Sequence, residues 1–210
     1  MQMLYLLLRG GCIPDRYIKR RIIMKKSATK TIVATGLGAA LFMVLFMFVK
    51  VPSPVPETNL QIAYGVSAFF AALFGPICGF LVAFIGHALN DFIAYGSPWW
   101  SWIVASGICA LATGLASGKL APQIEEGVFG KKELAIFLIY TLIGQALAWV
   151  VVAPVLDIVI YSEPVNLVFT QGAIAFVMDF ICAGLIGGLL LKAYAASKAG
   201  RGTLTKDSNS

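Results

Sequence analysis

Charged residues are absent from most of the chain, and the stretches that lack them set its pattern. No Lys, Arg, Asp or Glu occurs in residues 31–49, 58–90, 92–118, 134–156, 164–178 and 180–191. The second stretch is too long for one membrane crossing of about 20 residues. It contains Gly75-Pro76, which interrupts a helix because proline cannot continue the hydrogen-bond ladder. The pattern therefore predicts six helices, near 30–50, 60–74, 77–95, 99–117, 134–157 and 167–193.

Strands are not expected in this chain. No ten-residue alternation of apolar and polar positions repeats along it, and open sheet edges are not tolerated in lipid. The predicted fold class is all-α, an integral membrane bundle of six transmembrane helices. Three regions follow from the charges: a basic N-terminal leader at 1–27, a membrane domain at 28–195 and a polar cytoplasmic tail at 196–210. Because Met24 precedes two lysines and a membrane helix, we hypothesise that residues 1–23 come from an upstream start assignment.

Composition excludes a soluble globular protein. Hydrophobic residues make up 59% of the chain and charged residues 12%, with a mean hydropathy of +0.86, whereas soluble proteins carry about 25% charged residues. We therefore expect a multi-pass protein of the cell membrane that contacts lipid. The net charge of +6 does not indicate nucleic acid as a partner, because the basic residues flank apolar segments.

The distribution of basic residues predicts the orientation. They gather before the first helix, after the fourth and in the tail, whereas Lys50 is the only base in the opposite loops. Cytoplasmic loops carry the excess of Lys and Arg in membrane proteins. Six helices with both the N and C termini in the cytoplasm satisfy this pattern, and five or seven helices do not.

No motif for catalysis, nucleotide binding or metal binding is convincing. The run from Gly114 to Lys119 resembles a phosphate loop, but its spacing is short by one and Leu120 replaces the Ser/Thr that would hold magnesium. His87 is the only histidine, and it has no partner at metal-ligand spacing. We predict that the chain is not an enzyme and has no cofactor, metal site or disulfide of its own.

Polar residues inside apolar segments are costly in lipid, so they are candidates for function. His87, Asn90 and Asp91 share one face of the third helix at spacings i, i+3 and i+4. The aromatic turn 94–102 follows, with Trp99 and Trp102. Two interpretations stay open: an interfacial aromatic belt capped by Asn90 and Asp91, or a pocket in which aromatic rings hold a planar ligand whose edge these polar groups bind.

The last two predicted helices carry a second polar cluster. Its members are Tyr140, Gln145, Trp149, Asp157, Asn166, Gln171 and Asp179. Asp179 lies near the middle of an otherwise uncharged segment, where an ionised carboxylate in contact with lipid would cost about 2.5–3.5 kcal/mol. We therefore expect Asp179 to face the interior, as a proton-relay residue or as a structural contact to a neighbouring helix.

The first helix carries small residues at a spacing that suits close helix packing. Ala34/Gly38 and Gly36/Ala40 are both small-xxx-small pairs. They indicate either internal packing or a contact with a partner protein. The loop 50–57 that follows contains three prolines and favours an extended segment, which either spans the helix tops or covers an outer pocket as a lid.

Three runs of residues resemble the S components of energy-coupling factor (ECF) vitamin transporters. They begin at Asn59 (NLQIAYG), Phe70 (FAALFGP) and Gly79 (GFLVAFIGHALNDFIAYGSPWWSW). The resemblance covers about residues 28–195 and is most specific at 79–102. Within that family the chain looks like a subgroup filed as an uncharacterised protein family and variously linked to riboflavin, hydroxymethylpyrimidine or vitamin B6.

This resemblance implies a function and partners. S components have six helices, bind a vitamin from outside and work with a transmembrane scaffold subunit and two ATPase subunits, which use the ATP. Their Ala-xxx-Ala motif contacts the scaffold, and Gly36-xxx-Ala40 is the nearest match here. The resemblance does not choose the ligand. The tryptophans and a few neutral hydrogen-bonding groups favour a flat, largely uncharged heterocycle such as hydroxymethylpyrimidine or pyridoxine over the larger riboflavin.

The substrate-binding candidates combine the two polar clusters with the positions from which family sites are built. They are His87, Asn90, Asp91, Trp99, Trp102, Gln145, Trp149, Asn166 and Gln171. The alternative is a proton- or ion-coupled carrier that acts alone through His87, Asp91 and Asp179.

Overall fold

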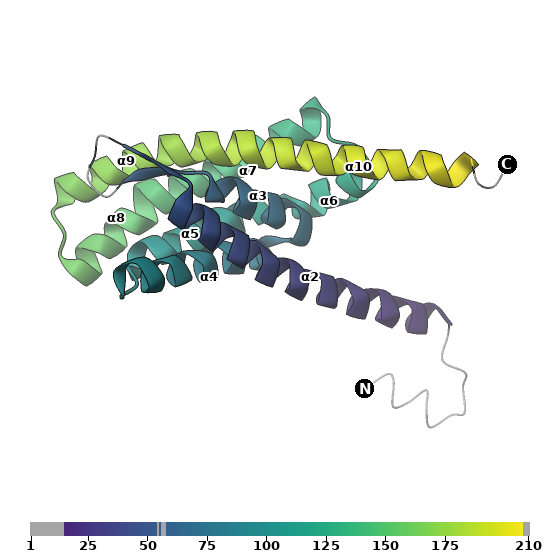
Figure 1. Ribbon diagram of the computed structural model, residues 1–210, viewed down its shortest axis with the longest axis horizontal. Coiled ribbons are helices and arrows are strands. Elements are labelled where there is room, and N and C mark those ends of the chain that lie inside the picture. Colours follow the sequence, from purple (N-terminus) through teal and green to yellow (C-terminus); the bar gives the residue numbers. More distant parts are fainter. Residues whose placement is uncertain (1–14, 54, 56–57, 208–210) are drawn as a thin grey trace, which may run out of the picture. The chain divides into compact units, whose positions relative to one another are not determined.

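The computed structural model describes residues 15–53, 55 and 58–207, which form helices joined by short turns and loops, with one short ribbon of two strands (Figure 1). The chain divides into two compact units, Met1–Val33 and Ala34–Ser210. Helix α2 (Asp15–Phe48) crosses that boundary. The hypothesis that residues 1–23 are not native falls largely outside the described part, which begins at Asp15.

The larger unit contains the remaining elements. In chain order they are β1 (Lys50–Pro52), β2 (Asn59–Gln61), α3 (Ala63–Phe74), α4 (Pro76–Tyr95), α5 (Trp100–Gly114), α6 (Ser117–Glu125), α7 (Lys131–Ala146), η1 (Leu147–Val152), α8 (Ala153–Leu156), η2 (Asp157–Tyr161), α9 (Val165–Cys182), η3 (Ala183–Gly187) and α10 (Gly188–Asp207). The η segments are π-helical turns within two long helical rods, which run over residues 131–161 and 165–207.

The apolar helices confirm an α-helical membrane bundle. Four helical stretches are long and apolar enough to cross a membrane: Ala28–Phe48, Pro76–Tyr95, Lys131–Tyr161 and Val165–Ala199. The pair α5 and α6 makes a fifth if it counts as one span, although it bends by 61°. Each of the six predicted regions contains a helix, but α3, at 12 residues, is only about 18 Å long at 1.5 Å per residue.

Helix α3 is short because protein surrounds it. It contacts α4, α5, α6, α9 and α10, and nine of its residues are buried, among them Tyr64 and Ser67. A Cβ atom added to Gly65 would lie 2.5 Å from the Cβ of Ile186, so glycine is what lets the last helical rod approach here. A helix enclosed by its neighbours has no need to match the lipid thickness by itself.

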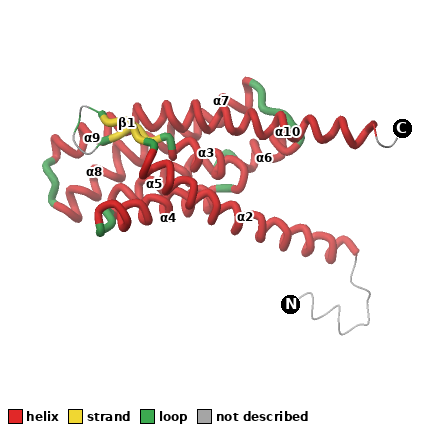
Figure 2. The backbone as a smooth tube through the Cα atoms, in the orientation of Figure 1, coloured by secondary structure: helices red, strands yellow, loops and turns green. Residues whose placement is uncertain are grey.

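The expectation of no strands is wrong. Strands β1 and β2 pair antiparallel with Lys50 opposite Gln61 and Pro52 opposite Asn59, and they are the yellow ribbon in Figure 2. Lipid forbids open sheet edges only within its hydrocarbon layer. This ribbon lies at one end of the bundle, where β1 is exposed, so that argument did not apply to it.

We expect Gly79→Ala to lower the thermal stability of the detergent-solubilised protein. The new Cβ would lie 2.4 Å from the Cβ of Ala71 and 2.8 Å from the carbonyl oxygen of Ala110, and overpacking typically costs about 1–3 kcal/mol. Gly118→Ala is the matched control, because nothing lies within 4 Å of its added Cβ. Thermal unfolding followed by tryptophan fluorescence measures both, and equal midpoints would contradict this packing.

Candidate functional site

A cavity of about 410 Å³ opens among the helices of the larger unit, near the β1–β2 ribbon. This is toward the lower end of the range of roughly 300–1,000 Å³ for small-molecule sites. Its walls come from the end of α2 and from β2, α3, α4, α5, η2, α9 and the connections between them. The lining residues are Phe46, Thr58, Asn59, Gln61, Tyr64, His87, Asp91, Tyr95, Ser97, Trp99, Trp102, Asp157, Glu163, Leu167, Gln171, Ala175 and Asp179.

Asp157 holds two of the tryptophans in the wall of this cavity. Its Oδ1 accepts a hydrogen bond from Trp99 Nε1 at 2.7 Å and another from the Ser101 hydroxyl, and its Oδ2 accepts one from Trp102 Nε1 at 2.7 Å. The side chain is 2% exposed. Both carboxylate oxygens are therefore used, and the two indole rings are fixed relative to η2.

Asp91 fixes the turn between α4 and α5. Its Oδ2 accepts the backbone N–H of Trp99 at 3.0 Å, and its Oδ1 accepts Asn90 Nδ2 at 3.1 Å. His87 Nε2 lies 3.5 Å from the same Oδ1, as the i, i+4 spacing predicts. Asp91 thus caps the start of α5, which was one part of the aromatic-belt interpretation.

Ser106 links three helices behind the cavity wall. Its hydroxyl lies 2.7 Å from Nδ1 of His87 on α4 and 2.8 Å from the hydroxyl of Tyr64 on α3. The ring of Phe46, from α2, packs over His87 with centroids 4.4 Å apart. His87 therefore has partners at both nitrogens and an aromatic neighbour, and its orientation is fixed.

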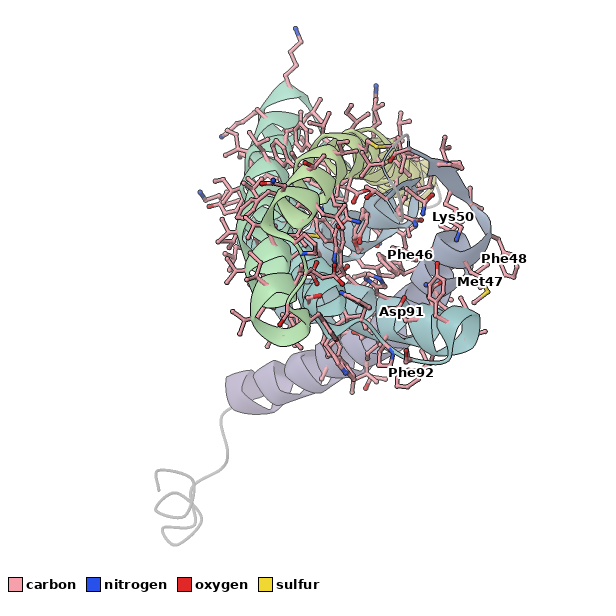
Figure 3. The ribbon with its side chains drawn as sticks, turned by 90° about the vertical axis from the view of Figure 1, so that its left-hand side faces the viewer. Phe46, Met47, Phe48, Lys50, Asp91 and Phe92 are labelled. Atoms are coloured by element: carbon pink, nitrogen blue, oxygen red, sulfur yellow. The ribbon has the colours of Figure 1, made fainter. Side chains whose placement is uncertain are left out.

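The side chains at the end of α2 divide sharply between inside and outside. Figure 3 shows Phe46 pointing into the bundle, toward the interior where Asp91 also points. Met47 and Phe48 point away from the bundle in the same view, and Phe48 is 73% exposed. The last turn of α2 therefore contributes one aromatic ring to the cavity.

Four aromatic rings form a continuous row, three in the cavity wall and Trp149 behind it. Tyr64 packs edge-on against Phe46 and Trp149, with centroids 6.0 and 5.4 Å apart. Trp149 in turn lies 5.2 Å from Trp102, and its Nε1 donates to Gln145 Oε1 at 2.5 Å. Flat walls of this kind suit a planar ligand, because offset and edge-on ring contacts add to the burial of apolar area.

Wide helical turns place two of these residues. Trp149 lies in η1 and Asp157 begins η2, with Pro154 between them in α8. Proline cannot donate to the carbonyl one turn earlier, so the regular hydrogen-bond ladder is interrupted there. Such π-helical turns are common at functional sites. Gly172 of α9 packs so closely here that an added Cβ would overlap the carbonyl oxygen of Trp149.

Asp179 faces the cavity, as predicted for a buried acid in α9. It is 3% exposed, and its Oδ1 accepts the backbone N–H of Gln61 at 3.3 Å. Gln61 belongs to β2, so this bond joins the ribbon to the last helical rod. The Gln61 side chain is 6% exposed, and its Oε1 is buried without a hydrogen-bond partner among the described residues.

The structure brings five of the nine predicted binding residues to the cavity wall. These are His87, Asp91, Trp99, Trp102 and Gln171. Three others, Asn90, Gln145 and Trp149, lie behind the wall. Asn90 donates a hydrogen bond to Asp91, and Gln145 accepts one from Trp149. Asn166 is exposed at the start of α9 and lies outside the cavity. The role of each in binding stays a prediction.

Several lining residues were not among the predicted binding residues. Asp157 and Asp179 belong to the second polar cluster of the sequence, and the cost of a charge in lipid is the signal by which they could have been included. Gln61 and Tyr64 lie within the run that carries the family resemblance, but nothing in the sequence pattern distinguishes them. Phe46 is one of several phenylalanines in an apolar helix.

The two small-residue pairs on α2 face opposite ways. Gly38 is buried, and an added Cβ would lie 2.7 Å from Val82 Cγ2, so this side of the helix packs on α4. Ala34 is also buried. Gly36 and Ala40 are exposed, and nothing lies within 4 Å of a Cβ on Gly36. Ala34 and Gly38 thus fit the internal-packing interpretation, whereas Gly36 and Ala40 leave room for a partner, and the partner contact stays a prediction.

Comparisons with known proteins place the chain among transporter subunits. The family model described as "ECF-type riboflavin transporter, S component" matches residues 26–196. A UPF0397 protein of Lactococcus lactis subsp. cremoris (strain NZ9000) is 45% identical over 184 residues, covering 88% of this chain and all of the relative. One from Lactiplantibacillus plantarum is 46% identical over 183 residues, covering 87% of this chain and 97% of the relative. No solved structure matches.

We expect Asp157→Asn to destabilise the cavity wall. An amide offers one acceptor oxygen and two donors, so one indole N–H would face another donor, and a buried unsatisfied polar group costs about 1–3 kcal/mol. The tryptophan signals in the near-ultraviolet circular dichroism spectrum should weaken, because the indole rings are held less rigidly. The midpoint of thermal unfolding should also fall. Glu163→Gln is the control, because Glu163 is only partly buried; equal losses in the two variants would refute the anchoring role of Asp157.

Proposed function

The chain belongs to the family of ECF-type riboflavin transporter S components, and we propose that it captures a small flat vitamin or vitamin precursor from outside the cell. It then delivers this ligand inward together with a separate scaffold subunit and two ATPase subunits. The family is one of transport proteins and not of enzymes. The observation that carries the proposal is the cavity, which combines a wall of aromatic rings with a few fixed polar groups.

The fixed geometry of the aromatic rings supports a binding role over a lipid-interface role. Trp99 and Trp102 donate their indole N–H groups inward to Asp157, whereas belt tryptophans sit at the level of the lipid headgroups. Trp100 fits the belt interpretation, since it is exposed and stacks on Phe84 outside the cavity. The belt and the pocket therefore use different tryptophans of the same turn.

The charges support an orientation with the cavity toward the outside. The β1–β2 ribbon lies at the left end of the bundle in Figure 1, and α6 and the far end of α10 lie at the right. Lys119 is on α6, Lys131 begins α7 and Lys192 is on α10. Because basic loops stay in the cytoplasm, we place this end at the cytoplasmic side of the cell membrane and the ribbon end at its outer side. Six crossings and cytoplasmic termini are part of the same proposal.

The ligand candidates remain hydroxymethylpyrimidine and pyridoxine first and riboflavin next. The family is described by riboflavin, and all three are flat ring systems that suit an aromatic wall. The cavity of about 410 Å³ favours the smaller rings.

We expect the purified protein to carry a vitamin-class molecule that mass spectrometry of the extract identifies. Titration of that molecule should quench tryptophan fluorescence, and Trp102→Ala should weaken its binding about tenfold or more, because a ring contact and apolar area are lost. Trp100→Ala is the matched control, since Trp100 does not line the cavity. Unchanged affinity in Trp102→Ala would favour the interpretation of Trp99 and Trp102 as part of an interfacial aromatic belt.

Uptake of the same molecule into liposomes distinguishes the proposed function from that of a carrier that works alone. His87, Asp91 and Asp179 all line the cavity, which a proton-coupled carrier would also require. Liposomes that contain only this protein should show no uphill uptake in a proton gradient. Uphill uptake there would overturn the energy-coupling proposal.

We expect Gly36→Leu to abolish co-purification with the scaffold subunit while ligand binding stays intact. Gly36 is exposed and has open space beside it, so a larger side chain blocks a close helix approach without disturbing this bundle. The control is Val177→Leu, an exposed position on α9. Complexes that form equally well with both variants would show that the scaffold contacts another surface.

A further inference from the structure

We propose that the ligand presents adjacent N–H donors to Asp179 and Gln61, and is therefore a neutral or cationic amino-substituted nitrogen heterocycle. This inference rests on the proposed function and names the substrate chemistry of the same cavity. It excludes ligands with a carboxylate or phosphate group. The argument has three parts: the charge of the lining, the hydrogen bonds already made within it, and the acceptors that remain.

The lining of the cavity is acidic. Its described residues include four carboxylates, from Asp91, Asp157, Glu163 and Asp179, and none of these described residues is Lys or Arg. His87 lies against Asp91 and Ser106 and so offers an anion no free positive charge. A carboxylate or phosphate would be repelled at close range in a site shielded from water, whereas a donor-rich ligand is attracted.

Two of the four carboxylates are occupied by the protein itself. Both oxygens of Asp157 accept hydrogen bonds from Trp99, Trp102 or Ser101. Both oxygens of Asp91 accept as well, from Asn90 and from the Trp99 backbone. These acids shape the wall and hold rings in place, so they are not the groups that recognise a ligand.

Among the described lining residues, Asp179 and Gln61 supply buried acceptor oxygens that are still available. Asp179 has one hydrogen bond in the described structure, from the Gln61 backbone to Oδ1, which leaves Oδ2 for a ligand. Gln61 Oε1 is buried and unpartnered, and both side chains line the cavity. A buried acceptor left without a donor costs about 1–3 kcal/mol. A ligand that brings N–H groups to this position removes that cost.

The aromatic wall decides which kind of donor fits. A planar heterocycle with an exocyclic amino group beside a ring nitrogen packs against Tyr64 and Trp102, and its edge matches a carboxyl group. One amino N–H donates to Oδ2 of Asp179, the oxygen that the Gln61 backbone leaves available. A second amino N–H then reaches the amide oxygen of Gln61. Among the candidate ligands this ranks hydroxymethylpyrimidine, which has a 4-amino group, above pyridoxine and riboflavin.

The test is a thermodynamic cycle with two matched probes. One is 4-amino-5-hydroxymethyl-2-methylpyrimidine, and the other is its analogue with a methyl group in place of the amino group. Isothermal titration of the detergent-solubilised full chain should give a preference of about 10- to 100-fold for the amino compound, as expected when hydrogen bonds to a charged group are lost. In Asp179→Asn this preference should fall to a few-fold.

A second variant distinguishes a loss of binding from a folding defect. Gln61→Met removes the unpartnered acceptor with a side chain of similar shape and leaves the backbone N–H that Asp179 accepts. Its thermal midpoint should be equal to or above that of the unchanged chain, because a buried unsatisfied group is lost. Its affinity for the amino compound should nevertheless fall, while its affinity for the methyl analogue should not.

The outcomes separate the two proposals. Binding of riboflavin or pyridoxine without binding of the amino compound would overturn this inference and leave the transport function standing. An unchanged preference in both variants would also overturn it. If none of these compounds binds and no small molecule co-purifies, the proposed function itself fails.

Discussion

The arrangement of the cavity depends on one buried carboxylate. Asp157 accepts hydrogen bonds from two indole groups and one hydroxyl, and all three donors come from the turn at the start of α5. Charge-assisted bonds in a site shielded from water are among the strongest that side chains make. This single contact ties α5 to the helical rod 131–161, and the aromatic wall takes its shape from that connection.

The three buried aspartates differ in how their carboxylate oxygens are used. Asp91 and Asp157 have both oxygens occupied by donors of the protein itself, whereas Asp179 accepts one described hydrogen bond and lines the cavity. The sequence pattern marks Asp91 and Asp179 as costly charges in apolar segments and places Asp157 near the outer end of a helix. What distinguishes them is how many donors their neighbours supply, and that depends on tertiary contacts between residues far apart in the chain, such as the 118 positions that separate Gln61 from Asp179.

Prediction from sequence succeeded where a signal was local. Each of the six predicted regions contains a helix, although α6 lies outside them, Gly75-Pro76 marked the break between α3 and α4, and the i, i+4 spacing placed His87 beside Asp91. It failed where the cause was non-local. The β1–β2 ribbon depends on pairing across a proline-containing loop, Asn166 is exposed and outside the cavity lining, and the inward side of α2 is decided by its contact with Val82 of α4. A single sequence carries no local mark of such contacts.

The wide turns at η1 and η2 also constrain how this chain can vary in length. Each one accommodates an additional residue compared with a regular α-helix. Removing the additional residue of such a turn would restore a regular α-helix, but deleting one residue from the regular helix α7 would rotate all that follows by about 100°. Asp157 would then leave its tryptophan partners and face a different neighbour. The rod that carries Trp149 and Asp157 can therefore accept substitutions along its exposed side far more readily than a change of one residue in the length of α7.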